Sequence, residues 1–147
     1  SLLFNSAICA TVVVSTDNCS IQEAIDMAMI GDTIEVHSGR YQEHINISKP
    51  VILHGLDDGG GMPIIASNEA QSIIEINTEG VTLDGFYLEP LDNSNGCGVV
   101  VTSDNTTIKN NVIVNNSYSG IQILKSNNSY IVNNSISNTP FEHDLLM

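Results

Sequence analysis

Three residues whose side chains can exchange protons or bind ions take the same place in successive copies of one short motif. His54, Asp84 and Lys109 are each the fourth residue, in VILHG, VTLDG and TTIKN. A histidine beside a carboxylate can act as a general acid or base, which makes this row the best catalytic candidate in the sequence. The alternative is a solvated ladder of mixed charges, in which an exposed pair contributes less than about 1 kcal/mol.

A second set of residues could bind carbohydrate. Glu75 and Gln122 fall in another row of outward-facing positions. The rings of Tyr87, Tyr118 and Tyr130 could stack on sugars, although aromatic residues scattered in this way more often serve in packing. We expect a polysaccharide to be the ligand if there is one.

Two stretches lengthen the repeat and are therefore candidate binding loops, namely DDGGGMP from Asp57 and EPLDNSNGCG from Glu89. In the second stretch, Asp92 and Asn95 are similar to the front of a calcium loop, but the full ligand alternation and the closing glutamate are missing. The four histidines show no metal-ligand spacing. We therefore expect neither a metal nor another cofactor.

Cysteines and glycosylation sequons indicate in which cellular compartment the protein folds. Cys9 and Cys19 flank the strand-like ATVVVS and could form a disulfide in an oxidising compartment, with two buried thiols as the alternative, and Cys97 would stay unpaired. A secreted glycoprotein would suit the six Asn-x-Ser/Thr sequons, although a chain rich in Asn, Ser and Thr also generates sequons by chance. They begin at Asn18, Asn46, Asn105, Asn115, Asn127 and Asn133.

Charge and hydropathy limit the classes of molecule that the protein can bind and the places where it can be located. Four Lys and Arg against 17 Asp and Glu give a formal net charge of −13, which would repel nucleic acid and anionic lipid headgroups. No apolar run approaches the roughly 20 residues that cross a bilayer. The opening SLLFNSAICA, residues 1–10, is either the tail of a signal peptide or a first buried strand. We expect a secreted or cell-surface protein, with the periplasm as the alternative.

Short strand-like segments recur along the chain at intervals of 22 to 30 residues. VTLDGFYL, TTIKNNVI and SYIVNNSI align with one another, and GVVV and GIQI align in a second register 22 residues apart. Segments of three to five residues, separated by Asn, Gly, Ser and Asp, are typical of a parallel β-solenoid. The sequence therefore predicts an all-β fold, a right-handed single-stranded parallel β-helix of about four to five coils.

The repeat explains why paired asparagines recur along the chain. Equivalent residues of successive coils stack about 4.8 Å apart, so Asn110 should lie over Asn133 and Asn111 over Asn134. Asparagine tolerates the left-handed conformation of tight turns, and its amide can bond both to its copy and to turn carbonyls. These pairs are therefore expected at the corners of the coils rather than at a ligand.

The two ends of the solenoid differ. CSIQEAIDMAMIGDT predicts a capping helix over 20–30, because Ser20 and Glu23 have capping-box spacing and Gly31 is a helix stop. Coils follow over 33–139 in a single domain, 1–147, that we expect to be a piece of a longer chain. No amphipathic cap follows the last coil, so PFEHDLLM should fold back as a plug, or the open end should meet further coils or a second copy.

The stretch IQEAID, GDTIEV, GRYQEHI and VILHG resembles the start of the pectin-lyase-like superfamily of right-handed parallel β-helix proteins. The later NNVIVNN, GIQILKSNN and SYIVNNSI look like the NosD-like and carbohydrate-binding repeat domains of microbial surface and periplasmic proteins. The resemblance spans about residues 20 to 139. Because its matching residues are those that any such solenoid requires, it specifies the fold far more than the activity.

Enzymes of this superfamily provide the alternative function. The resemblance implies an outer-face Arg, Gln and carboxylates for a pectin methylesterase, or an Arg or Lys base with calcium-binding carboxylates for a lyase. Arg40 is the single arginine and sits in the structural GRYQE turn. We therefore expect a non-catalytic exported or cell-surface module that binds carbohydrate. The alternative is a polysaccharide-active esterase or lyase with an incomplete catalytic set.

Overall fold

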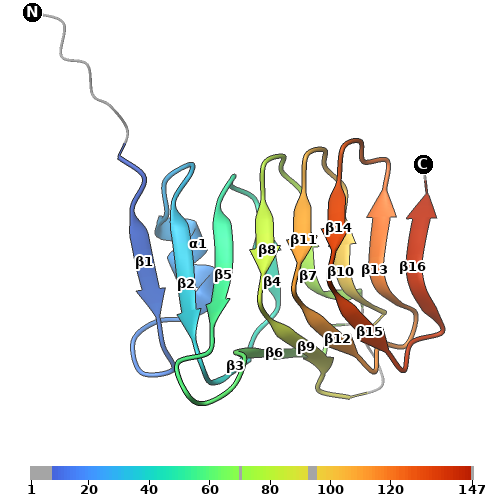
Figure 1. Cartoon of the computed structure of the whole chain (residues 1–147), viewed down its shortest axis with the longest axis horizontal. Coiled ribbons are helices and arrows are strands. Elements are labelled where there is room, and N and C mark those ends of the chain that lie inside the picture. The colour runs from blue at the N-terminus through green and yellow to red at the C-terminus, as the bar shows by residue number, and fades with distance from the viewer. Residues whose placement is uncertain (1–7, 70, 93–95, 147) are drawn as a thin grey trace, which may run out of the picture.

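The computed structural model describes residues 8–69, 71–92 and 96–146, with the backbone alone for residues 141–146. Its strands form three parallel sheets, which we call A, B and C, and each coil contributes one strand to each sheet in turn (Figure 1). Sheet A contains β1 (Thr11–Val14), β2 (Thr33–His37), β5 (Ile52–Leu56), β8 (Thr82–Asp84), β11 (Thr107–Lys109) and β14 (Tyr130–Val132).

The other two sheets complete five coils. Sheet B contains β3 (Arg40–Gln42), β6 (Ile64–Ser67), β9 (Tyr87–Pro90), β12 (Val112–Val114) and β15 (Ser135–Ser137). Sheet C contains β4 (Ile45–Ile47), β7 (Ser72–Ile76), β10 (Cys97–Val101), β13 (Ser119–Leu124) and β16 (Phe141–Leu146). The predicted all-β parallel β-helix is therefore confirmed.

The predicted alternation of faces is also confirmed. In sheet A, Leu53, Leu83 and Ile108 are register partners whose side chains are buried. Successive strand residues point to opposite faces, so the residues that follow these three, His54, Asp84 and Lys109, form a ladder on the outside.

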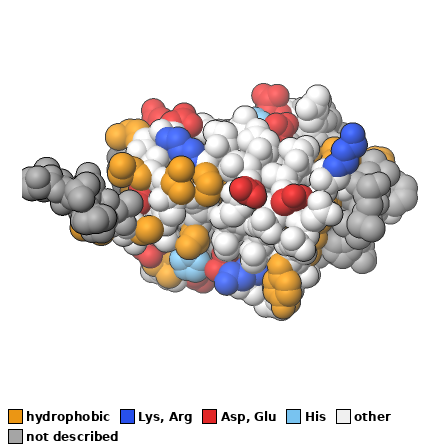
Figure 2. All heavy atoms as spheres, turned by 90° about the horizontal axis from the view of Figure 1, so that it is seen from above, with side chains coloured by type: hydrophobic (Ala, Val, Ile, Leu, Met, Phe, Trp, Pro, Cys, Tyr) orange, Lys and Arg blue, Asp and Glu red, His pale blue; other side chains and the backbone are white. Residues whose placement is uncertain are grey.

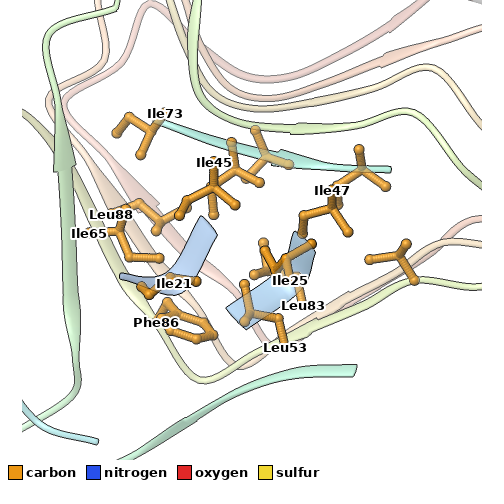
Figure 3. Packing of buried hydrophobic residues seen from close by; sticks show 14 of the residues in the cluster. Ile21, Ile25, Ile45, Ile47, Leu53, Ile65, Ile73, Leu83, Phe86 and Leu88 are labelled. Atoms are coloured by element: carbon orange, nitrogen blue, oxygen red, sulfur yellow. The ribbon is translucent and has the colours of Figure 1, made fainter. Parts of the chain in front are cut away.

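Helix α1 (Ile21–Met27) closes the N-terminal end of the core. Ser20 Oγ accepts from Glu23 N–H, and the Glu23 carboxylate accepts from Ser20 N–H, which is the predicted capping box. In Figure 3, Ile21 and Ile25 lie among buried residues of all three sheets, which include Ile45, Ile65 and Leu83. The helix thus excludes water from the first coil.

Two details at this end differ from the expectation. The helix ends at Met27 rather than near residue 30, because Ala28 is extended (φ −68°, ψ 155°) and the Asp32 carboxylate accepts from Met29 N–H at 2.8 Å. Strand β1 precedes the helix and pairs with β2, so sheet A begins before the cap. The range 1–10, predicted as a signal-peptide tail or first strand, lies largely outside the described residues, and β1 begins just after it.

The C-terminal segment PFEHDLLM was expected either to fold back as a plug or to leave the end of the solenoid open, and the structure excludes the plug. Residues 141–146 form β16, which pairs in parallel with β13 and starts from Ser119 opposite Phe141. The segment therefore continues sheet C and does not fold back as a plug. The proposed self-association through this end stays a prediction.

Left-handed asparagines make the corners. Asn110, Asn115, Asn133 and Asn138 have φ between 55° and 61°. Asn133 Nδ2 donates to Asn110 Oδ1 at 2.6 Å, and Asn138 Nδ2 donates to Asn115 Oδ1 at 3.1 Å. The predicted role of these asparagines at the turns is thereby confirmed.

Candidate functional site

The outer face of sheet A carries two parallel files of side chains, one residue per coil, which we call the sheet A strip. The first file consists of Thr33, Ile52, Thr82, Thr107 and Tyr130. The second consists of Glu35, His54, Asp84, Lys109 and Val132. The strip therefore presents hydroxyl groups beside ionisable groups along most of the length of the solenoid.

Asp84 is the centre of the polar contacts on this strip. Its Oδ2 lies 3.2 Å from His54 Nδ1 and 3.8 Å from Lys109 Nζ, and its Oδ1 accepts from Asn110 Nδ2 at 2.8 Å. The Asp84 side chain is 16% exposed, whereas His54 and Lys109 are 37% and 40% exposed. The three residues predicted as a row are thus brought into contact, with the carboxylate held between an imidazole and an ammonium group.

A second polar cluster borders the same strip. His37 Nε2 lies 2.9 Å from Glu35 Oε1, and His37 Nδ1 lies 3.1 Å from Asp58 Oδ2 in the loop that follows β5. The bond to Glu35, followed by the charge of Asp58, raises the pKa of His37. A hydrogen bond with Ser38, together with His37, lowers the pKa of Asp58.

At the C-terminal end of the strip, the first file ends at Tyr130 and the second at Val132. Tyr130 is 63% exposed, and Val132 beside it is 38% exposed. An exposed aromatic ring at the end of a row of hydroxyl groups can stack on an apolar face of a ligand while the row binds its polar groups. Sequence reasoning treated Tyr130 as one of several scattered rings and did not connect it with His54.

The residues predicted to bind carbohydrate are distributed over other faces. Glu75 and Gln122 lie on sheet C with Val100 between them, and Glu75 accepts from Ser72 Oγ at 3.4 Å. Tyr87 lies half-buried on sheet B, and Tyr118 lies in the loop before β13. The structure does not bring these four residues together, and a role for them stays a prediction.

The predicted calcium candidates occupy the loop after β9. Asp92 is exposed, and Asn95 lies outside the described residues. Among the residues that the structure describes, no three His, Cys, Asp or Glu side chains gather in a group suited to a metal ion.

Three of the four basic residues are engaged in structural contacts. Arg40 forms an ion pair with Glu89 across sheet B. Lys49 Nζ donates to the carbonyl oxygens of Asp26 and Ala28 at the end of α1. With Lys109 beside Asp84, only Lys125 has no contact of this kind among the described residues.

Cys9 is exposed, Cys19 half-buried and Cys97 buried, and no disulfide joins Cys9 to Cys19 in this structure. The Cys9–Cys19 pairing therefore stays a prediction.

In four of the six sequons, the asparagine Nδ2 atom, to which a glycan would be attached, donates a hydrogen bond within the protein. Asn18 donates to Val13 O, Asn105 to Glu79, Asn127 to Asp104 and Asn133 to Asn110. The exposed Asn46 and Asn115 accept through Oδ1 instead.

A cavity of about 360 Å³ lies near the N-terminal end, lined by residues 16–20 and by Arg40, Tyr41 and Glu43. Its polar groups are already committed to the fold. Glu43 accepts from the N–H groups of Ile21 and Gln22, and Tyr41 Oη donates to His37 O. The cavity is therefore a weaker candidate than the strip.

Sequence reasoning missed the His37 cluster and the threonine file. Glu35 and His37 are two apart in a strand, so a shared face could have been inferred from their spacing. Asp58 reaches His37 only through the conformation of an irregular loop, for which the coil period provides no signal.

Comparison with known proteins identifies the fold. No family model and no curated protein matches the sequence. Among solved structures, the chain is similar to a mutant of the PL6 family alginate lyase AlyGC, with a TM-score of 0.58 and 21% sequence identity. The match covers 92% of this chain and 20% of the alginate lyase chain. The chain is thus a parallel β-helix protein that spans about a fifth of that structure.

No helix among the described residues is long and apolar enough to cross a membrane. Acidic side chains outnumber basic ones on the face seen in Figure 2, and hydrophobic ones gather toward the N-terminal end. Met27, Met29 and Ile30 are the large exposed apolar residues around the end of α1.

Proposed function

We propose that this chain is a non-catalytic, exported or cell-surface β-helix module that binds a polysaccharide along the sheet A strip. The observation that carries the proposal is the strip itself, with hydroxyl and ionisable groups in register and Tyr130 exposed at its end. Strands of neighbouring coils are about 4.8 Å apart, a repeat of the same order as that of sugar rings in an extended chain. Each coil could then contact one sugar.

The charge of the chain favours a neutral polysaccharide. A formal charge of −13 repels polyanions such as uronate polymers, and on the strip Glu35 and Asp84 would face them directly. Carboxylates, an imidazole and threonine hydroxyls can instead bind the hydroxyl groups of a neutral glycan. The similar alginate lyase is a polysaccharide-active protein on this fold, which agrees with a carbohydrate ligand. We also propose membership of the pectin-lyase-like superfamily, on the residues quoted above.

Titration calorimetry against soluble neutral and uronate polysaccharides tests this proposal. We expect binding to a neutral polymer, weakened roughly five- to tenfold by Tyr130→Ala, the loss expected for one stacked ring. Asp84→Asn should also weaken it, because the carboxylate loses its charge. Gln42→Ala and Ser137→Ala, at exposed positions of sheet B away from the strip, are the controls. Absence of binding to every polymer, or equal losses in the controls, would refute the proposal.

One observation favours an enzyme as the second candidate. His54 Nδ1 lies against Asp84 Oδ2, and a carboxylate that orients an imidazole in this way is an arrangement found in general bases. An esterase or lyase of this kind would release methanol or unsaturated ends from uronate polymers. Products that appear with the parent and disappear with His54→Ala would establish this function in place of the binding module.

A further inference from the structure

The loop of residues 57–62, between β5 and β6, is tied to the end of β2 by a histidine that bridges two carboxylates. His37 Nε2 lies 2.9 Å from Glu35 Oε1 and Nδ1 lies 3.1 Å from Asp58 Oδ2. An ionised carboxylate can only accept, so both contacts are hydrogen bonds only if each imidazole nitrogen carries a proton. We infer that His37 is a pH-operated clamp, which holds this loop closed when protonated and releases it when neutral.

Besides His37, polar bonds within the loop and to Ser38 hold it. Within the loop, Asp57 Oδ1 accepts from the N–H groups of Gly59 and Gly61 at 2.9 Å. Ser38 Oγ accepts from Asp58 N–H at 3.1 Å and donates to Gly61 O at 2.6 Å. Gly59 and Gly61 have φ of 113° and 92°, and a methyl group added at either would meet no atom within 4 Å. At Gly60 an added methyl group would come within 3.0 Å of Ser38 Cβ, so the loop packs closely at this residue. Elsewhere it is held by polar bonds, so the loss of one of them changes its position.

Few groups face His37, and the two carboxylates among them both raise its pKa. Glu35 on β2 and Asp58 in the loop contact its ring, while Tyr41 on β3 donates to its carbonyl oxygen. Glu35 first, then Asp58, raises the pKa of His37 above its ordinary 6.5, so the clamp is complete at lower pH and is lost as the pH rises through this raised pKa. The pKa of Asp58 is lowered below 3.8, so the clamp also weakens as the pH falls through that lower value.

Release of the clamp would change the strip. Glu35 is the register partner of His54, and in the closed state its Oε1 is bonded to His37. A neutral imidazole keeps one N–H and can bond to only one of the two carboxylates. The tautomer whose proton lies on Nε2 releases the loop, and the tautomer whose proton lies on Nδ1 leaves Glu35 available to accept from sugar hydroxyls. This consequence rests on the proposed function, and it predicts tighter binding of the neutral polysaccharide above the pKa of His37.

A pH titration followed by NMR tests the clamp without any ligand. We expect the Asp58 amide and the His37 imidazole signals to change with one midpoint above 6.5. The protection of the Asp58 amide, which is its exchange rate corrected for the base-catalysed intrinsic rate, should fall roughly two- to fivefold across that midpoint, the range for loss of an exposed charged pair. His37→Gln should abolish this response, because the glutamine amide does not titrate. The matched control His54→Gln changes a strip histidine that does not contact the loop, and it should leave the response intact.

An Asp58 amide that ignores the titration of His37, or that responds equally in His37→Gln, would overturn the clamp. Calorimetry of the parent with the bound polysaccharide, about one pH unit on each side of the midpoint, tests the link to binding. A pH-dependent loop with unchanged affinity would reject that link alone. If no polysaccharide binds, the proposed function fails while the NMR result still decides the clamp.

Discussion

Asn111 supplies hydrogen bonds that the interior of the solenoid cannot obtain from water. It is 1% exposed, its Oδ1 accepts from Phe86 N–H at 2.9 Å, and its Nδ2 lies 3.2 Å from Leu83 O and 3.1 Å from Asn134 Oδ1. One coil later, Asn134 Nδ2 donates to Ile108 O at 2.9 Å. The buried Asn111 and the half-buried Asn134 thus satisfy backbone groups where the chain turns between sheets A and B.

At this residue scale we predict that Asn111→Ala lowers the free energy of unfolding by about 2–4 kcal/mol, since it leaves buried backbone groups without partners. Urea denaturation followed by circular dichroism measures the change. Its neighbour Asn110 is exposed with φ of 57°, a conformation that glycine adopts freely. The control Asn110→Gly should therefore cost less than about 1 kcal/mol. Equal losses in the two variants would show that burial is not the cause.

Helix α1 is an element whose position depends on acceptors at its first turn. Ser20 Oγ accepts from Glu23 N–H at 3.0 Å, and Glu43 from the first coil accepts from the N–H groups of Ile21 and Gln22. The first-turn donors are thus shared between a local cap and a tertiary contact. Beneath them, Ile21 and Ile25 are fully buried against the first coils.

At the element scale, Ser20→Ala should lower the free energy of unfolding by about 1 kcal/mol through loss of the cap. Thermal and urea unfolding measure it. Ser137→Ala on the exposed side of β15 is the matched control and should change stability by less than about 0.5 kcal/mol. A loss no greater than that of the control would mean that Glu43 alone suffices to hold the helix.

The whole molecule is asymmetric at its ends. At the N-terminal end, α1 covers the core, and Asn18 Nδ2 donates to Val13 O on the outer edge of β1. At the other end, β14, β15 and β16 are each last in their sheets among the described residues. Ile131 and Ile136 are only partly buried there. An open strand edge with apolar side chains behind it is a template for another chain.

At the scale of the molecule we predict concentration-dependent association through this C-terminal edge, measured by sedimentation velocity. Association should survive truncation after Asn138, because removal of β16 uncovers β13 instead. Ile136→Lys should reduce association by placing a charge at the edge, whereas Val13→Lys at the opposite end is the control and should not. If the parent and the truncated chain are both monomeric and equally stable, the edge does not drive association.

The sequence by itself determined the β-helix, the buried and exposed faces of its strands, the asparagine corners and the capping box. These features repeat with the coil or depend on neighbours a few residues apart, and in a solenoid each coil contacts chiefly the next. Stacking of His54, Asp84 and Lys109 followed from the same period. Only the tertiary structure decided the reach of Asp58 to His37 and the use of the two ends of the chain. Strand β1 pairs with β2, and β16 with β13, at the 22-residue interval of the coils, but the sequence left residues 1–10 open between a strand and a signal peptide and the C-terminal segment open between a strand and a plug. The physical reason is that Asp58 lies in an irregular loop whose conformation depends on contacts distant in the chain, while the end strands depend on pairing with coils that are already formed.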